Sequence, residues 1–432
     1  MDSVIPRPGK VEIGFTDDRL TGTGGAVFLA EAAKRLGLLP LLAEAVSVKR
    51  RARGASDAET QWSLVASLAS GGGALSDVDA LRGDAVQREL LGLREAPSSR
   101  RLGEFLRRLT KWDVERLEGV LRHLTAALAP AVVEHEVSER GYVPVFVDGT
   151  GIEVDGRLFE HAARLYTGER GYWLHGIFVG GLWVSGRLRP GGDVTCGWKG
   201  QMKRDLAPLP PPGTPVWVHC DSAHYRGAFV EYVSDRGWDY SVSVTDANKC
   251  RPVLDVVEDL PEHGWTDIGM GESATWVRHR PARWRDEQSY VVVRGTVERQ
   301  GELFPRLSVI LASRDDLPLA EVVRRHRSKQ GHENAFKGPL VDLDLHHPPC
   351  RGYRANQAFH AYGRMAHLLL RAVQYGLLPK AARRHGIRPL VRHLMRTVAR
   401  LVASGRRRSL LFASCCFRRD WLFFASLQLE GG

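Results

Sequence analysis

The sequence lacks the features that mark membrane, secreted and disulfide-stabilised proteins. No run of about 18 apolar residues occurs, so we expect no membrane span. The first twenty residues carry acidic side chains and no apolar h-region, which excludes a signal peptide. The six cysteines are scattered and form no Cys-x-x-Cys pair, which favours reduced, mostly buried thiols over a disulfide framework or a zinc site. These absences together predict a cytoplasmic protein with no membrane partner.

Acidic residues are nearly missing from the C-terminal part of the chain. Residues 351–432 contain sixteen lysines and arginines but only two acids, Asp420 and Glu430. The whole chain of 432 residues has a formal charge of +11, so the excess of positive charge lies in this part. A basic block this concentrated suits binding to a polyanion. The same charges also suit an ordinary solvated helical face.

The spacing of apolar residues divides the chain into regions of different predicted structure. Helical spacing dominates the first 140 residues, where Ser56 and Glu59 form a capping box. Short β-branched and aromatic runs dominate from residue 141 to 315, and helices return from Leu319. At this length two to four domains or subdomains are expected. We predict five segments: a helical N-terminal region (1–140), the first part of an α/β core (141–249), a β-rich insertion (250–315), a core helix (316–350) and a basic helical region (351–432).

Two aspartates and one glutamate are the candidate catalytic residues. Asp148 ends the apolar run that begins at Val143, and Asp221 ends a second run that begins at Val216. Glu333 lies within a predicted helix. A strand that ends in a carboxylate brings that acid to the edge of the sheet, although a capping or turn aspartate would have the same pattern. Two such aspartates and a helical glutamate suit a pair of divalent cations for phosphodiester chemistry.

The order of several short motifs resembles that of a known enzyme family. The matching stretches are Ser76–Asp84, Val147–Thr150, Gly168–Tyr172, Cys220–Tyr225, the segment around Glu333, and Arg351–Gln357. In this order they resemble the DDE transposases of bacterial insertion sequences, in the insertion-sequence-four-like superfamily. The resemblance implies an α/β fold with a ribonuclease-H-like core, interrupted by a β-rich insertion, and with helical N-terminal and C-terminal regions.

The same resemblance implies a function, cofactors and partners. It implies Mg²⁺- or Mn²⁺-dependent DNA cleavage at element ends and strand transfer into target DNA. Asp148 would bridge two metal ions, while Asp221 would bind one ion and Glu333 the other. The expected partner is double-stranded DNA, both terminal repeats and target, bound by a homodimer at the bacterial nucleoid.

Two other functions stay open: a catalytically impaired, transposase-derived DNA-binding protein, and a host nuclease with the same core. The presence of all three acids argues against the first. The N-terminal helical region and the basic tail argue against the second.

Further residues are expected to contact DNA. The superfamily pattern around the glutamate has Tyr, Arg and Lys where this chain has His326, Lys329 and Leu340. Lys329 keeps a positive charge, and Lys337 is a candidate substitute for the missing lysine. We expect both lysines to contact phosphates, although Lys337 and Glu333 also have the spacing of a surface ion pair.

Other candidate DNA-binding residues lie outside that motif. A predicted helix from Pro389 to Ser404 would carry a stripe of arginines along one face to track phosphates: Arg388, Arg392, Arg396 and Arg400. Trp284 is expected either to pack in the core or to stack on a displaced base. The His346–His347 pair is interpreted as part of a loop and not as a metal site.

Overall fold

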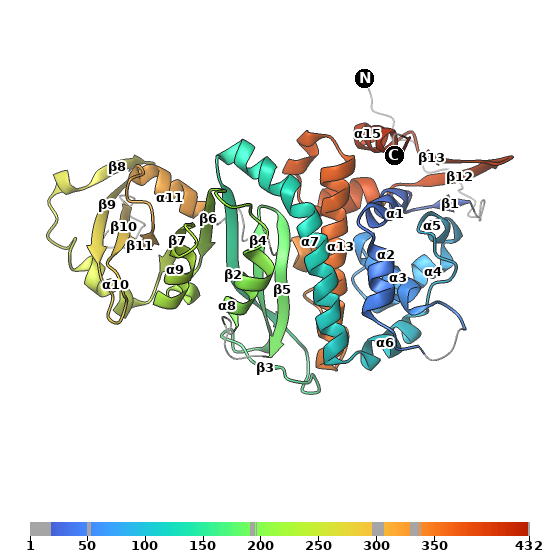
Figure 1. Cartoon of the computed structure of the whole chain (residues 1–432), viewed down its shortest axis with the longest axis horizontal. Coiled ribbons are helices and arrows are strands. Elements are labelled where there is room, and N and C mark those ends of the chain that lie inside the picture. The colour runs from blue at the N-terminus through green and yellow to red at the C-terminus, as the bar shows by residue number, and fades with distance from the viewer. Residues whose placement is uncertain are drawn as a thin grey trace, which may run out of the picture.

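The structure is a computed structural model, and it describes residues 19–49, 53–190, 195, 197–295, 306–328, 336 and 338–430. The chain is a mixed α/β protein. Figure 1 shows an elongated arrangement, with the sheet in the centre and towards one end and the N-terminal helices towards the other. No helix among the described residues is long and apolar enough to cross a membrane.

The N-terminal region is helical, as the sequence predicts. Its helices are α1 (Ala26–Arg35), α2 (Leu38–Ala45), α3 (Asp57–Ala69), α4 (Val78–Gly83), α5 (Ala85–Leu90), α6 (Ser99–Arg108) and α7 (Lys111–Arg140). The predicted capping box is confirmed, because the Glu59 amide donates to Ser56 Oγ (3.1 Å) and the Ser56 amide donates to Glu59 Oε2 (2.7 Å).

One sheet of ten strands runs through the central part of the described chain. The strands are β2 (Val143–Glu153), β3 (Ala163–Arg164), β4 (Arg170–Val179), β5 (Leu182–Pro190), β6 (Val216–Cys220), β7 (Asp239–Val244), β8 (Thr266–Gly269), β9 (Glu272–His279), β10 (Gln288–Gly295) and β11 (Leu307–Ala312). Their order is β3-β4-β2-β6-β7-β11-β10-β9-β8, and β5 pairs with β4 on the side. Strands β2, β6 and β7 are parallel, while the other pairs are antiparallel. The β-rich segment expected as an insertion therefore continues the same sheet beyond β7.

The predicted end of the strand at Asp148 is wrong. Asp148 does not end a strand, because β2 continues to Glu153 along its antiparallel partner β4. The apolar run from Leu174 to Val184 forms a hairpin of β4 and β5, turned at Gly180, whose φ is +54°. The Gly180–Gly181 pair inside this run is the local sequence signal for the turn.

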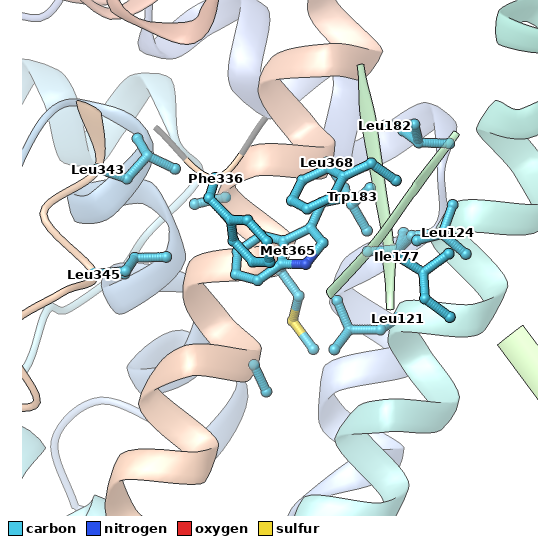
Figure 2. Close-up of a cluster of buried hydrophobic side chains, with 14 of the residues drawn as sticks. Leu121, Leu124, Ile177, Leu182, Trp183, Phe336, Leu343, Leu345, Met365 and Leu368 are labelled. Atoms are coloured by element: carbon cyan, nitrogen blue, oxygen red, sulfur yellow. The ribbon is translucent and has the colours of Figure 1, made fainter. Parts of the chain in front are cut away.

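Long helices cover the sheet and join it to the N-terminal region. Helix α13 (Tyr353–Leu377) packs against α7, α3 and β5 and is buried along most of its length. Figure 2 shows the core around it, where Trp183, Met365, Leu368 and Phe336 meet. The remaining helices near the sheet are α8 (Trp198–Gln201), which a π-helical turn continues to Leu206, α9 (Gly227–Ser234), α10 (Ala247–Leu254) and α11 (Leu319–Arg327).

The predicted helix from Pro389 to Ser404 is wrong. Residues Ile387–Leu390 form α14, a π-helical turn follows to Met395, and then the chain extends into β12 (Ala399–Ser404). Strand β12 pairs with β1 (Leu20–Thr21) and with β13 (Arg407–Phe412), and α15 (Arg419–Glu430) follows. These pairings override the local helical spacing. Figure 1 shows the β12–β13 hairpin extending away from the body of the protein.

The cysteines follow the sequence interpretation where the structure describes them. Cys220, Cys250 and Cys350 are buried, Cys416 is half-buried and Cys415 is exposed, and all five are free thiols. Cys196 lies outside the described residues.

Candidate functional site

The two candidate aspartates lie next to each other at one edge of the parallel strands. In the β2–β6 ladder Val147 pairs with Cys220, so the following residues, Asp148 and Asp221, are neighbours across the strands. Adjacent strands are about 4.8 Å apart. Strand β6 ends at Cys220, and beyond this point the side of β2 that faced β6 is no longer paired with it. The two aspartates therefore lie side by side at a half-open edge, even though β2 itself continues.

The carboxylate of Asp221 is held in place by the turn that follows β6. Asp221 Oδ1 accepts a hydrogen bond from the Ala223 amide (3.2 Å) and lies 2.9 Å from Nδ1 of His224. The Asp221 side chain is 35% exposed, whereas His224 is buried. One oxygen of the carboxylate is therefore fixed from the interior, while the side chain keeps access to the edge of the sheet.

A chain of buried polar side chains continues from His224 into the protein. Nε2 of His224 lies 3.0 Å from Nε2 of His175, and Nδ1 of His175 lies 2.8 Å from Oε1 of Gln201. Gln201 also donates through Nε2 to Ser185 Oγ (3.0 Å) and to the His175 carbonyl (3.2 Å). The linked groups come from β4, β5, α8 and the turn after β6. Each is buried, so removal of one partner would leave an unsatisfied polar atom.

The direction of the hydrogen bond between His175 and Gln201 follows from Arg189, because a guanidinium group can only donate. Arg189 donates to Oε1 of Gln201, which identifies that oxygen as the acceptor. Nδ1 of His175 is therefore the donor towards Gln201. Burial, with His224 as a further cause, lowers the pKa of His175 to about 3, so this ring is neutral at physiological pH.

A phenylalanine close in sequence to Glu333 packs on the same side of the sheet as Asp148. Gly176 is the cross-strand partner of Asp148, so their side-chain directions lie on one face. A Cβ added at Gly176 would lie 2.5 Å from the Phe336 ring, and that ring packs edge-on against Phe178 at 5.0 Å. Figure 2 shows Phe336 inserted among the core side chains. The absence of a side chain at Gly176 makes room for this contact.

Helix α11, on the other side of Glu333 in the sequence, is also fixed to the sheet. Arg325 lies over the rings of Tyr142 and Trp217, with its Cζ 4.4 and 4.8 Å from the ring centroids. Nε2 of His326 lies 3.0 Å from Ser243 Oγ on β7. Glu333, Lys329 and Lys337 lie outside the described residues. The nearest described residue before Glu333 is Ser328, which follows α11. The nearest one after it is Phe336, which contacts the sheet.

Comparison with known protein families assigns the chain as a whole. The family described as transposase DDE domain group 1 matches residues 6–430. The chain belongs to this DDE transposase family. No curated protein matches the chain.

The remaining DNA-binding candidates of this transposase do not form the predicted stripe on one helix. Arg388 is in α14, where its backbone amide and Nε donate to Asp342 (3.1 and 3.0 Å). Arg392 is in the π-helical turn, Arg396 follows it and Arg400 is in β12. All four arginines are exposed. The four exposed arginines are therefore spread over four kinds of local structure: an α-helix, a π-helical turn, the segment after it and a strand.

Trp284 has a half-buried position beside the turn that follows Asp221. Its ring centroid lies 5.1 Å from that of Tyr225, and a Cβ at Gly227 would touch the indole at 3.3 Å. Trp284 lies between β9 and β10, in the β-rich segment. This packing contact joins that segment to the loop that carries the second aspartate.

The His346–His347 segment is an irregular loop, as predicted. Its side chains nevertheless converge, because the ligand atoms of Asp344, His346 and His347 lie within 4.8 Å of one another. The carboxylate of Asp344 packs on Gly73 of the N-terminal region. This group is partly exposed and its members contact one another, with His347 Nδ1 2.9 Å from Asp344 Oδ1.

Sequence reasoning missed the interior half of the transposase site. His224 stands three residues after Asp221, a spacing that a turn after a strand can bring into contact. His175 is a polar residue within the apolar run of β4, which is a second signal. Nothing in the local sequence marks Gln201, because its role depends on α8 lying beside β4.

Proposed function

We propose that this transposase cuts DNA at the ends of a mobile element and transfers the cut strands into target DNA, with Asp148, Asp221 and Glu333 as its catalytic acids. The observation that carries the proposal is the register of β2 and β6, which makes the two aspartates neighbours at one edge of the sheet. The described residues that flank Glu333 in sequence are fixed to the same sheet. Family membership supports the reaction class.

The donor set fits divalent metal ions. Carboxylate oxygens are the ligands that Mg²⁺ and Mn²⁺ prefer, and two adjacent aspartates would repel each other without a cation. Asp148 would bridge two ions, Asp221 would bind one and Glu333 the other. Two bound ions would activate the attacking water or 3′-hydroxyl and stabilise the leaving oxygen.

The protein's own side chains orient the acids for this task. His224 and the Ala223 amide hold Oδ1 of Asp221, which limits rotation of the carboxylate. The Gly149 amide donates to Asp148 Oδ1 (2.7 Å). Phe336 and His326 fix the residues on either side of the Glu333 segment to the sheet. Lys329 and Lys337 would bind the phosphates next to the reacting bond, and Trp284 would stack on a base near the Asp221 turn.

The strand order supports a ribonuclease-H-like core for this enzyme. Strands β5, β4 and β2 are antiparallel neighbours, and β6 and β7 then continue parallel to β2. The segment with β8 to β11 separates this part from Glu333 in sequence, which supports the insertion. The insertion-sequence-four-like class, a homodimer on DNA, end recognition by residues 1–140 and a place at the bacterial nucleoid rest on the resemblance of the motifs.

The test is neutralisation of each acid in turn. Asp148→Asn, Asp221→Asn and Glu333→Gln should each reduce nicking of DNA that contains the element ends by about a thousandfold or more, because amides keep the shape but lose the charge that holds the ions. Nicking is measured with Mg²⁺, with Mn²⁺ and with a chelator. Binding to the same DNA should stay within a few fold of that of the parent.

Three results would reject parts of this proposal. Nicking at the parental rate by any of the three variants would remove that residue from the catalytic set. If the parent binds terminal-repeat DNA but never nicks it, the chain is a transposase-derived binding protein. If the parent cuts any DNA equally well, it acts as a nuclease without end specificity.

A further inference from the structure

A second polar site lies behind the candidate active site. A cavity of about 510 Å³ opens between β5, helix α7 and the segment formed by α8 and its π-helical turn. Ser185 and Gln201, which belong to the hydrogen-bonded chain that ends at Asp221, line one part of it. The charged lining residues are Arg122, Arg187, Arg189, Arg204, Glu118 and Asp205.

Positive charge exceeds negative charge around this cavity. Among the described residues that line the cavity there are four arginines and two acids, and Glu118 is already paired with the buried Arg364 (2.9 Å). Two partners just outside the lining also carry charge: Glu115, which pairs with Arg187 (2.7 Å), and Arg364, which pairs with Glu118. Their charges cancel, so the excess of two positive charges among these residues is unchanged. A concave site with such an excess attracts anions, and the planar guanidinium fork matches phosphate geometry.

One buried oxygen in the cavity lacks a hydrogen-bond donor. Asp205 is 7% exposed, and its Oδ2 accepts from Ser185 Oγ (2.6 Å). Its Oδ1 accepts no hydrogen bond from any residue in the described part of the chain, and its ion-pair partner, Arg122 Nη1, is 3.8 Å away. A buried acceptor left in this state costs free energy, and a ligand that brings a donor would satisfy it.

We propose that this cavity binds a phosphate group that carries a proton, such as a phosphate monoester or inorganic phosphate. The arginines bind the charged oxygens, and the P–OH group donates its hydrogen bond to Oδ1 of Asp205. A phosphate monoester has its second pKa near 6, so a protonated form is accessible near neutral pH. A phosphodiester and a sulfate carry no such proton. The volume exceeds that of phosphate alone and has room for an attached sugar.

The position of the cavity suggests the source of the ligand. Gln201 touches the cavity and holds His175, which in turn contacts His224 beside Asp221. A bound phosphate therefore sits at the inner end of the chain that orients a catalytic acid. The 5′-phosphate of a cut DNA strand is the monoester that DNA cleavage supplies, and this assignment of source rests on the proposed function.

Binding is tested by calorimetry on the full chain in a phosphate-free buffer at a pH of about 6.5, close to the second pKa of phosphate. Inorganic phosphate should bind at millimolar concentration or tighter, and sulfate should bind about tenfold more weakly, because it offers no donor to Asp205. A short 5′-phosphorylated oligonucleotide should bind more tightly than the same strand with a 5′-hydroxyl. If inorganic phosphate binds more tightly than sulfate but the 5′-phosphate adds no affinity to the oligonucleotide, the cavity is a phosphate site whose ligand is free phosphate.

Two neighbouring residues provide a matched pair of variants. Arg204→Gln removes a charge that lines the cavity, whereas Lys203→Gln removes an exposed charge from the same helical turn outside it. Arg204→Gln should weaken phosphate binding about tenfold, and Lys203→Gln should leave it within about twofold. Asp205→Asn should abolish the preference for phosphate over sulfate. Circular dichroism and thermal melts confirm that each variant folds.

Three results would overturn the phosphate site: no binding of phosphate up to high millimolar concentration, equal binding of sulfate by the parent chain, or equal effects of Arg204→Gln and Lys203→Gln. These results do not involve DNA cleavage. The proposal of a phosphate site and the proposal of three catalytic acids can therefore be rejected independently of each other.

Discussion

The interior of this transposase and its C-terminal surface both use arginine, but in opposite ways. Arg364 of α13 is 1% exposed, and it donates to Glu118 and to the carbonyls of Val184 and Gly186. Arg392 and Arg396, which follow α13 in the sequence, are exposed. The buried arginine joins α13, α7 and β5, so its cost of desolvation is offset by several specific partners.

This contrast shows why charge alone does not indicate function. An exposed arginine keeps its hydration, contributes little to folding and is available to DNA phosphates. A buried arginine has exchanged its hydration for fixed partners, and its removal leaves those partners unsatisfied. Burial alone does not separate the histidines, because His360 and His367 on α13 and His224 are all buried, yet only His224 contacts the candidate catalytic residue Asp221.

The largest effect is expected from breaking the buried ion pair. Arg364→Met leaves Glu118 buried without its partner and should lower the free energy of unfolding by about 3–5 kcal/mol. Arg392→Met, on the surface, should change it by less than about 0.5 kcal/mol. Urea denaturation curves of the two variants make the comparison. The double variant Arg364→Met/Glu118→Gln should recover part of the lost stability. If Arg392→Met destabilised the protein as much as Arg364→Met, the distinction between buried and exposed arginines would be wrong.

The buried histidines of α13 should make the protein sensitive to acid. Burial lowers the pKa of His360 to about 4 and holds that of His367 well below its ordinary value of 6.5. The unfolded chain therefore binds more protons between pH 6.5 and about 4, and stability falls as the pH decreases through this range. At about pH 5 the buried His360 should cost about 2 kcal/mol relative to neutral pH, and His367 acts in the same direction.

Thermal melts at neutral pH and near pH 5 measure this loss. His360→Leu should reduce the difference between the two conditions by about 2 kcal/mol, because it removes the contribution of His360 and leaves that of His367. If the melting temperature of this variant depends on pH as steeply as that of the parent, His360 is not enclosed in the way described.

The histidine beside Asp221 should matter for catalysis more than for folding. His224→Ala removes the side chain that holds Oδ1 of Asp221, and such supporting groups contribute about 10- to 100-fold to metal affinity or activity. Nicking rates measured over a range of Mg²⁺ concentrations should show a higher requirement for metal. His224→Asn, which keeps a donor, should restore part of the activity. Equal metal requirement in parent and variant would limit His224 to a structural role.

The smallest effect per residue is expected at the C-terminal surface. Replacing Arg392 and Arg396 together with alanine should weaken binding to element DNA and to random DNA alike, because side chains that bind the phosphate backbone read no bases. The log–log salt slope should become shallower by about 1.8, which is about 0.9 for each phosphate that the variant no longer neutralises. Binding isotherms at several salt concentrations test this. An unchanged slope would identify a solvated surface, and weaker binding to one sequence alone would indicate base reading.

Part of the site could be predicted from local patterns. Asp148 and Asp221 are recognisable because each follows a short apolar run, and short apolar runs bounded by Gly and Pro form buried strands. Their adjacency requires the parallel pairing of β2 and β6, which lie far apart in the sequence. The Ser56 capping box and α13 are predicted correctly, because helix caps and helical periodicity are local in sequence.

The errors arise where distant segments compete with local preference. The residues from Pro389 to Ser404 have helical spacing, yet β12 forms because β1 and β13 provide backbone hydrogen bonds on both sides. The apolar run before Asp148 predicts a strand end there, yet β2 continues because β4 is long enough to pair with it. Neither partner strand is visible from within the segment itself.

The transposase family, the two aspartates that follow apolar runs, the helical N-terminal region and the positive charge of the C-terminal part can all be recognised in the amino-acid sequence. The packing of distant elements establishes which polar groups lie behind Asp221, which arginines are buried and which are exposed, and that the β-rich segment continues the main sheet. The physical reason is the range of the interactions. Helix caps and apolar periodicity act over a few residues, whereas hydrogen bonds between His224, His175 and Gln201 exist only after three distant elements have packed together.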